Sequence, residues 1–212
     1  MIVDAIRDVF PDDAILAEEG GRGAPPGAEF CWIVDPLDGT TNFAHGFPRF
    51  CVSIGIERRE ERTIGVVYDP LLDERFEAVK GRGAWLGARR LAVSSEPELA
   101  RSLFATGFPY DVHTSDDDNL RAFANVVKSS RGIRRDGSAA LDLCYVAAGR
   151  VDGYWERKLH AWDVAAGILI VEEAGGRVSD ARGGPVDRSG RDVVATNGRV
   201  HASLLEKVRP VA

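Results

Sequence analysis

The sequence of 212 residues has few cysteines and no long apolar run. Its three cysteines, Cys31, Cys51 and Cys144, are widely spaced, which excludes a disulfide framework and a CxxC metal site. No stretch approaches the roughly 18 consecutive apolar residues of a transmembrane helix. The first residues also lack the basic and apolar regions of a signal peptide. We therefore expect a protein of the reducing cytoplasm with no membrane-bound part.

An excess of basic charge is also missing, because 33 acidic residues against 27 basic ones give a net charge of −6. A protein that binds nucleic acid through its charge needs a basic surface, so we expect no direct nucleic-acid binding. The sequence contains no Gly-x-Ser-x-Gly, no Walker loop and no Gly-x-Gly-x-x-Gly after a strand. An acidic protein of this kind is suited to concentrating cations in a pocket.

The order of the expected elements predicts layers of helix and sheet. A helix at 2–10 and a strand at 14–17 precede a glycine-rich surface loop at 20–28. The patterns predict later strands at 30–34, 51–57, 63–68, 75–80, 102–106, 151–156 and 193–196. They predict later helices at 116–128, after the N-cap Ser138, at 163–174 and at 201–208. We expect an α+β or α/β fold with subdomains at 1–130, which carries an antiparallel sheet and a metal site, and 131–212, forming one continuous catalytic unit.

The most specific motif is Asp35–Phe43, of sequence Asp-Pro-Leu-Asp-Gly-Thr-Thr-Asn-Phe. An apolar strand leads into two carboxylates three positions apart, at a turn that Pro36 and Gly39 favour. Thr40–Asn42 could open a helix, whose free N–H groups suit a phosphate. Mg²⁺ fits such a segment, because it is bound by few carboxylates together with water and substrate phosphate. The alternative is a turn in which both carboxylates only cap backbone N–H groups.

Two further acidic groups could join this motif. Glu18-Glu19 ends the strand at 14–17, so Glu18 can face Asp35 if the two strands are neighbours. An exposed glutamate pair is otherwise a solvated surface. Asp163 stands at the start of an almost wholly apolar helix, where it either caps the helix or points toward Asp35 and Asp38.

Other polar residues carry weaker signals. Glu156 follows a strand, and Gly137-Ser138-Ala139 begins a helix with free N–H groups, so either could hold a polar ligand. The four histidines are scattered and pair with no Ser or Cys in a nucleophile motif. The cysteines are more typical of small core side chains than of nucleophiles.

Together these motifs closely resemble the inositol monophosphatase family. The resemblance covers nearly the whole chain, through Val52–Gly55, Gly65–Tyr68, Gly81–Trp85, Ala105–Pro109 and Gly175-Gly176. The turn Asp-Gly-Thr-Thr-Asn-Phe is similar to the inositol monophosphatase branch. Branches that act on 3′-phosphoadenosine 5′-phosphate usually carry Lys after the first Thr, and classical fructose bisphosphatases carry Ser-Ser. The resemblance implies a sugar phosphatase fold with alternating α-β-α-β-α layers.

The resemblance also implies roles for individual residues. The ligands of two or three Mg²⁺ ions, for which Mn²⁺ could substitute, would be Glu18, Asp35, Leu37 through its carbonyl, Asp38 and Asp163. The catalytic residues would be Glu18 and Thr40, which orient the attacking water, and Asp38. The substrate would contact Leu37, Gly39, Thr40, Gly137, Ser138, Ala139, Glu156 and Asp163.

The implied activity is hydrolysis of a small polyol phosphate, most directly inositol 1-phosphate to inositol and phosphate. Histidinol phosphate, fructose 1,6-bisphosphate and a nucleotide stay open as other substrates. A non-catalytic regulatory or binding role also stays open, because some bacterial relatives act as partners of the transcription machinery. The family commonly forms homodimers, so we expect a homodimer.

The sequence departs from the family pattern in two places. Family members normally begin with about two more helices, which carry a Thr/Asp motif that helps to position the attacking water. Here Met1 falls just before the short helix that leads to Glu18-Glu19, so the chain is expected to lack those helices. Asp136 stands where relatives often have an apolar or small residue. An added carboxylate near the pocket could favour a cationic substrate such as histidinol phosphate.

Overall fold

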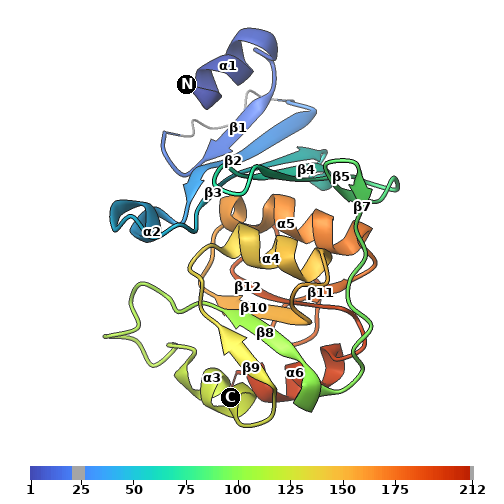
Figure 1. Ribbon diagram of the computed structural model, residues 1–212. Coiled ribbons are helices and arrows are strands. Elements are labelled where there is room, and N and C mark those ends of the chain that lie inside the picture. The colour runs from blue at the N-terminus through green and yellow to red at the C-terminus, as the bar shows by residue number, and fades with distance from the viewer. Residues whose placement is uncertain (21–26, 211–212) are drawn as a thin grey trace.

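The computed structural model describes residues 1–20 and 27–210, which form five layers (Figure 1). Helix α1 (Ile2–Val9) lies on one sheet, and a second sheet is covered by α3 (Leu120–Val127) and α6 (His201–Val208). Between the two sheets lie α4 (Ala139–Ala147) and α5 (Ala161–Glu173). The expected alternation of α-β-α-β-α layers is confirmed.

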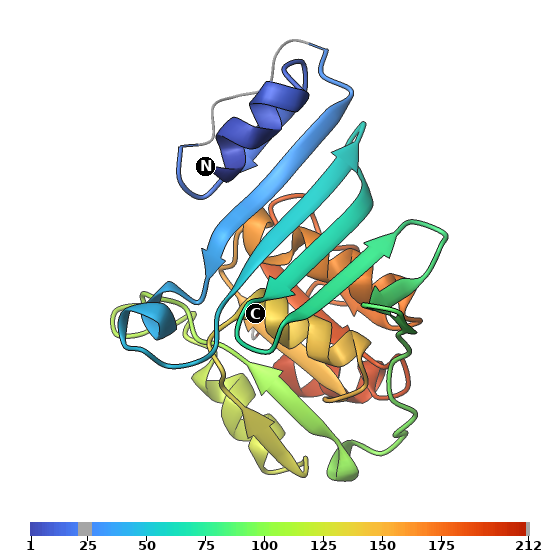
Figure 2. The same ribbon diagram turned by 45° about the horizontal axis from the view of Figure 1, so that its top comes forward.

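The first sheet has seven strands that follow one another in chain order. β1 pairs with β2 in parallel, and all later pairs are antiparallel, so the strands from β2 onward form a meander. The sheet is twisted (Figure 2). Its strands are β1 (Ala14–Ala17), β2 (Phe30–Asp38), β3 (Cys51–Arg58), β4 (Glu61–Asp69), β5 (Glu74–Val79), β6 (Ala84–Leu86) and β7 (Arg89–Arg90). In β3, every second residue from Cys51 to Glu57 is buried, as the two-residue period of a strand requires.

The second sheet has the order β11-β12-β10-β8-β9. Its strands are β8 (Leu103–Thr106), β9 (Gly132–Arg134), β10 (Gly153–Arg157), β11 (Arg177–Ser179) and β12 (Asp192–Thr196). β9 and β11 were not expected from the sequence, because three residues are too few to show a strand period. The chain changes sheets after β7, through a short 3₁₀ helix at Leu99–Arg101. The proposed division at residue 130 stays a prediction.

Helix α5 is apolar and almost fully buried from Val164 to Val171, because it packs between the two sheets. Two glycines let its backbone approach the first sheet closely. A Cβ on Gly65 would lie 2.7 Å from the carbonyl oxygen of Ala166, and one on Gly55 would lie 2.9 Å from the Cβ of Ala165. The small side chains of Ala165 and Ala166 thus allow α5 to pack closely against the first sheet.

Most element boundaries agree with the sequence, and the main exception is α3. The expected helix at 116–128 begins only at Leu120, because Asn119 has a left-handed φ of 67°. Cys51 and Cys144 are core residues as expected, whereas Cys31 is only partly buried. Most of the expected loop at 20–28 lies outside the described residues. In the described part of the chain, no helix has both the length and the apolar character needed to cross a membrane.

Candidate active site

The bend in β2 explains how the two carboxylates of the central motif reach one face. Residues three apart on a regular strand point to opposite sides. The β2–β3 register shifts between Asp35, which pairs with Ser53, and Asp38, which pairs with Cys51. The bulged segment between them contains Pro36, which has no N–H to donate to the ladder. Asp35 and Asp38 consequently point to the same face, and both are buried.

Three of the four acidic residues are oriented by a backbone N–H. Leu37 N donates to Asp35 Oδ1 at 2.9 Å, and His160 N donates to Asp163 Oδ2 at 2.7 Å. Asp38 Oδ2 accepts from the N–H of Ala140 at 2.8 Å. The two roles that the sequence left as alternatives, capping and pocket formation, are thus combined. Each of these three carboxylates uses one oxygen for its backbone hydrogen bond, and the other oxygen of the same carboxylate is not involved in that bond.

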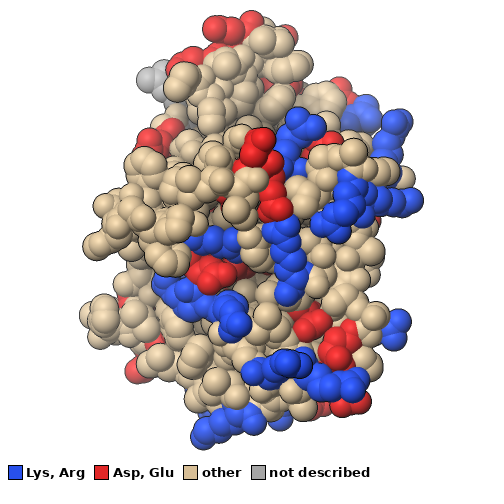
Figure 3. Space-filling model, viewed as in Figure 1, with Lys and Arg blue, Asp and Glu red and all other residues tan. Residues whose placement is uncertain are grey.

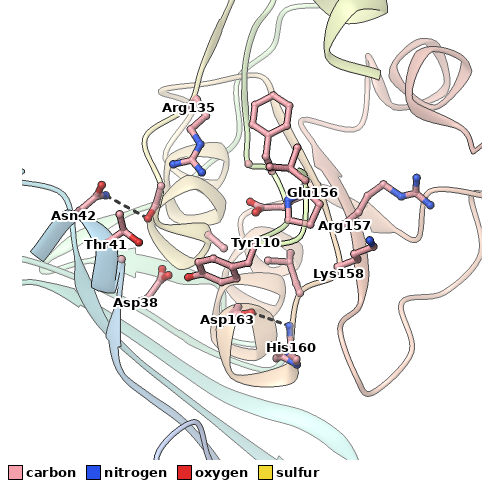
Figure 4. Close-up of a pocket in the computed structure, with 18 of the residues that line it drawn as sticks. Asp38, Thr41, Asn42, Tyr110, Arg135, Glu156, Arg157, Lys158, His160 and Asp163 are labelled. Carbon is pink, nitrogen blue, oxygen red and sulfur yellow. Dashed lines mark hydrogen bonds between the residues drawn. The ribbon is translucent and has the colours of Figure 1, made fainter. Parts of the chain in front are cut away.

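Glu18, Asp38 and Asp163 line one pocket of about 360 Å³, together with Glu156 on another wall (Figure 4). Asp35 is not part of this lining and is 2 % exposed, but it is close enough to Asp38, Glu18 and Asp163 to feel their negative charges. Glu18, Asp38 and Asp163, which are up to 145 positions apart, lie around this one pocket. The space-filling view shows basic and acidic side chains intermixed on one face, without one broad area of either sign (Figure 3).

Burial makes Asp35, Asp163 and Glu156 hard to ionise, because it raises the pKa of each carboxyl. It raises the pKa of Asp35 to about 8, and the negative charges of Asp38, Glu18 and Asp163 add to the effect. Burial likewise raises the pKa of Asp163 to about 7 and that of Glu156 to about 8. Because carboxylates crowded in this way repel one another, the donor set fits a divalent cation, which would favour their charged forms.

Within residues 1–20 and 27–210, no three His, Cys, Asp or Glu side chains stand in a geometry that would hold a metal ion by themselves. Mg²⁺ usually takes only one or two carboxylates and completes its shell with water and phosphate oxygens. The pocket therefore supplies the residue types for a cation but not a complete protein cage. The expected set of metal ligands stays a prediction.

The other expected site residues fall into three groups. Gly39, Gly137 and Ala139 line the pocket. Ser138 is buried and donates to Asp38 Oδ2 at 2.6 Å, so its hydroxyl holds a carboxylate. Thr40 is exposed and is not part of the lining, where its neighbour Thr41 stands instead. Leu37 also lies outside the lining, and these residues' roles toward a substrate stay predictions.

The glycine at position 39 is required by the turn. Its φ of 95° lies in the left-handed region, and it begins α2 (Thr40–Ala44). A Cβ there would lie 2.8 Å from the carbonyl oxygen of Arg49. Asn42, in the same motif, donates from Nδ2 to the carbonyls of Arg49 at 2.7 Å and Asp136 at 2.8 Å. The motif is thereby attached to the segment that precedes α4.

Several lining residues were not assigned to the site from the sequence. They include Asn42, Gly107, Tyr110, Arg135 and Lys158. Gly107 belongs to a family-like motif but has no reactive group, and the last three carry no motif at all. Asp136 was expected to add charge to the pocket, but it is not part of the lining, and its carboxylate lies 3.7 Å from Arg49 Nη2.

A five-layer fold with a carboxylate-lined pocket at the end of β2 is that of a sugar phosphatase. The chain matches the inositol monophosphatase family over residues 1–211, and it belongs to that family. It is 48% identical over 204 residues to an inositol-1-monophosphatase of Synechocystis sp., covering 96% of this chain and 71% of the relative.

A second relative, named Nus factor SuhB, from Pseudomonas aeruginosa, is 46% identical over 213 residues, covering 99% of this chain and 79% of the relative. The structure of an inositol monophosphatase from Anabaena (Nostoc) sp. superposes with a TM-score of 0.95 and 45% identity. That match covers 100% of this chain and 84% of the other. The expected family and fold are thereby confirmed.

Proposed function

We propose that the chain is a Mg²⁺-dependent phosphomonoesterase of small polyol phosphates, with inositol 1-phosphate as the preferred substrate. The observation that carries this proposal is the convergence of Glu18, Asp38, Asp163 and Glu156 on one pocket, with the buried Asp35 within reach of the charges of the first three. The relative from Synechocystis named inositol-1-monophosphatase supports the choice of substrate.

The acidic residues would hold two or three Mg²⁺ ions, or Mn²⁺ as a substitute, through Glu18, Asp35, the Leu37 carbonyl, Asp38 and Asp163. When bound, such ions neutralise the phosphate and lower the pKa of a nearby water. The backbone bonds to Asp35, Asp38 and Asp163 fix these side chains before the substrate enters, so little reorganisation is needed.

The remaining residues would position the two ends of the substrate. Gly39 and Thr40 contact the phosphate, and Glu18 with the Thr40 hydroxyl orients the attacking water. Gly137, Ser138, Ala139 and Glu156 bind the alcohol part. Glu156 suits a polyol, because a carboxylate accepts hydrogen bonds from two hydroxyl groups.

The test is phosphate release from inositol 1-phosphate with Mg²⁺ and with a chelator. Histidinol phosphate, fructose 1,6-bisphosphate and a nucleotide monophosphate are measured in parallel. We expect Mg²⁺-dependent release with the highest kcat/KM for inositol 1-phosphate. A higher value for another substrate would correct the specificity, and no release from any of them would contradict the enzyme assignment.

A regulatory role is a second candidate, because a relative with 46% identity is named Nus factor SuhB. We propose that this regulatory function, exerted in the cytoplasm, is independent of the acidic pocket. A cell in which Asp163→Asn replaces the wild-type residue would then keep the regulatory phenotype and lose phosphatase activity. Sedimentation at several concentrations would test the proposed homodimer.

A further inference from the structure

One wall of the pocket is built where the parallel strands β8 and β10 stop pairing. Their ladder ends at Thr106 and Trp155, and the next residues, Gly107 and Glu156, both line the pocket. A Cβ on Gly107 would lie 2.1 Å from both carboxylate oxygens of Glu156. The Glu156 carboxylate therefore rests against the Gly107 backbone. Its position depends on how the two strand ends are held beyond the ladder.

Asn119 joins these strand ends from outside the pocket. Its side chain is buried, and Nδ2 donates to the Gly107 carbonyl at 2.6 Å and to Thr106 Oγ1 at 3.0 Å. Its Oδ1 accepts from Trp155 Nε1 at 2.7 Å. The indole N–H can only donate, so it fixes which way the amide points. All three bonds lead to residues at, or next to, the end of the ladder.

The Thr106 hydroxyl extends this network to the residue before Glu156. It donates to the Trp155 carbonyl at 2.6 Å, and that carbonyl belongs to the peptide bond that leads into Glu156. Both Thr106 and Trp155 are fully enclosed, at 0% and 1% exposure. The path from Asn119 to the pocket wall is therefore continuous and shielded from water.

Asn119 stands at the N-cap position of α3, but its side chain does not cap the helix. The residue precedes the helix with a φ of 67°, in the left-handed region that is unfavourable for most residues with a Cβ and that Asn tolerates better. Its side chain makes no capping hydrogen bond to α3. The polar groups of the side chain are directed to the strand ends instead.

We propose that Asn119 is a positioning residue that gives the enzyme its preference for hydroxyl-bearing phosphates, by holding Glu156 and the Gly107 backbone in place. This inference rests on the proposed function and deepens it. Asn119 acts through Glu156 and does not contact the substrate. A change at position 119 should therefore weaken binding of the alcohol part and leave the carboxylates around the phosphate undisturbed.

Asn119→Asp tests the inference with almost no change in shape. The carboxylate still accepts from Trp155 Nε1, but it loses both N–H donors and faces the Gly107 carbonyl. We expect KM for inositol 1-phosphate to rise about tenfold. For p-nitrophenyl phosphate, which has no hydroxyl on its leaving group, we expect kcat/KM to change less than about twofold.

A matched control is Asn125→Asp, in the helix α3 that Asn119 precedes. Asn125 Nδ2 donates to the Lys207 carbonyl at 3.1 Å, so it has a comparable bond that leads to α6 and not to the pocket. This variant should keep the wild-type ratio of the two substrates. A second control is the double variant that combines Asn119→Asp with Glu156→Gln. Because the two residues act in one chain of contacts, their effects on KM should be clearly less than additive.

Circular dichroism first shows whether each variant is folded. If Asn119→Asp is unfolded, Thr106→Val carries the test, since it removes the Thr106 hydroxyl from the network and keeps a branched side chain. A folded variant with an unchanged substrate ratio, or with equal losses on both substrates, would overturn the inference. Inactivity of the wild-type chain toward both substrates would overturn the proposed function instead.

Discussion

The acidic side of the pocket and the side that carries Glu156 are built in different ways. Asp35 and Asp163 are oriented by backbone N–H groups only two and three residues away. The bonds that hold Gly107 and the strand before Glu156 join residues 12, 36 and 49 positions apart. The orientation of Asp35 and Asp163 is therefore encoded locally, whereas the other side exists only once the second sheet has formed.

Asp38 and Asn42 attach the acidic side to the rest of the pocket, and one of these bonds runs from the Ala140 N–H to Asp38 Oδ2 at 2.8 Å. Asp38 accepts a hydrogen bond from Ser138, which begins α4, at 2.6 Å. Asn42 donates to the backbone carbonyls of Arg49 and Asp136. The two sides are thus fixed in place but meet different parts of the proposed substrate. Changes on the acidic side should affect every phosphate ester, and changes on the other side only those with hydroxyl groups.

The largest effect is expected from Asp163→Asn. The amide oxygen can still accept from the His160 N–H, so the fold should be kept, but the negative charge is lost from the site. We expect kcat to fall about 10³-fold for inositol 1-phosphate and p-nitrophenyl phosphate alike. Steady-state assays with both substrates measure this. Asp38→Asn should behave in the same way.

The control for this loss is Asp8→Asn, an exposed carboxylate on α1. It has the same change in net charge and should leave both activities unchanged. Full Mg²⁺-dependent activity in either Asp163→Asn or Asp38→Asn would show that the acidic side is not the reaction centre. A loss confined to inositol 1-phosphate would remove the distinction between the two sides.

Asp35 and Asp38 could be singled out from the sequence because they lie in one contiguous motif. The motif Asp35-Pro-Leu-Asp contains two of the carboxylates, and the apolar strand before it indicates that they lie at a buried position. The bulge that turns them to one face was not predicted, since it depends on the register with β3. The role of Thr40 rested on resemblance alone, and the structure leaves that side chain exposed.

The Glu156 side could not be predicted in the same way. Glu156 follows a readable strand, but nothing near it in the sequence indicates that Gly107 packs against its carboxylate. Asn119 even lies inside a segment whose apolar spacing predicted a helix from residue 116. Its left-handed backbone is imposed by tertiary hydrogen bonds, which a local pattern cannot show.

A more selective effect is expected from Glu156→Gln. The Gln oxygen can still accept from the Tyr154 hydroxyl, which donates to Glu156 Oε2 at 2.7 Å. Burial raises the pKa of Glu156 to about 8, so the wild-type carboxyl becomes charged only as the pH rises past that value. Above it, a charged acceptor binds hydroxyls better than a neutral amide.

The ratio of wild-type to variant kcat/KM for inositol 1-phosphate should therefore grow with pH. We expect about a tenfold difference near pH 9 and about threefold or less near pH 6. Taking the ratio at each pH cancels titrations that both proteins share. For p-nitrophenyl phosphate the ratio should stay near one throughout. A pH-independent ratio would show that the charge of Glu156 does not contribute to polyol binding.

The smallest effect concerns thermal stability, to which the acidic side contributes together with Glu156, whose pKa burial also raises to about 8. Asp35 and Asp163 have pKa values raised from 3.8 to about 8 and about 7, mainly by burial. Between the unfolded and folded values, the folded chain binds more protons than the unfolded one. The free energy of unfolding therefore falls as the pH rises through this range. Mg²⁺ binds the ionised carboxylates, so its stabilising effect should increase with pH.

Melting temperatures with a chelator and with saturating Mg²⁺, between about pH 6.5 and 8.5, measure this trend. His201 does not interfere, because burial lowers its pKa to about 4, so its contribution is lost only as the pH falls below 6.5. An ion at about 100 times its Kd adds ~2.7 kcal/mol, which is a few degrees for a chain of this size. Asp163→Asn should reduce both the pH slope and the Mg²⁺ shift, whereas Asp8→Asn should keep them. An equal Mg²⁺ shift in wild type and Asp163→Asn would place the bound ion away from this side of the pocket.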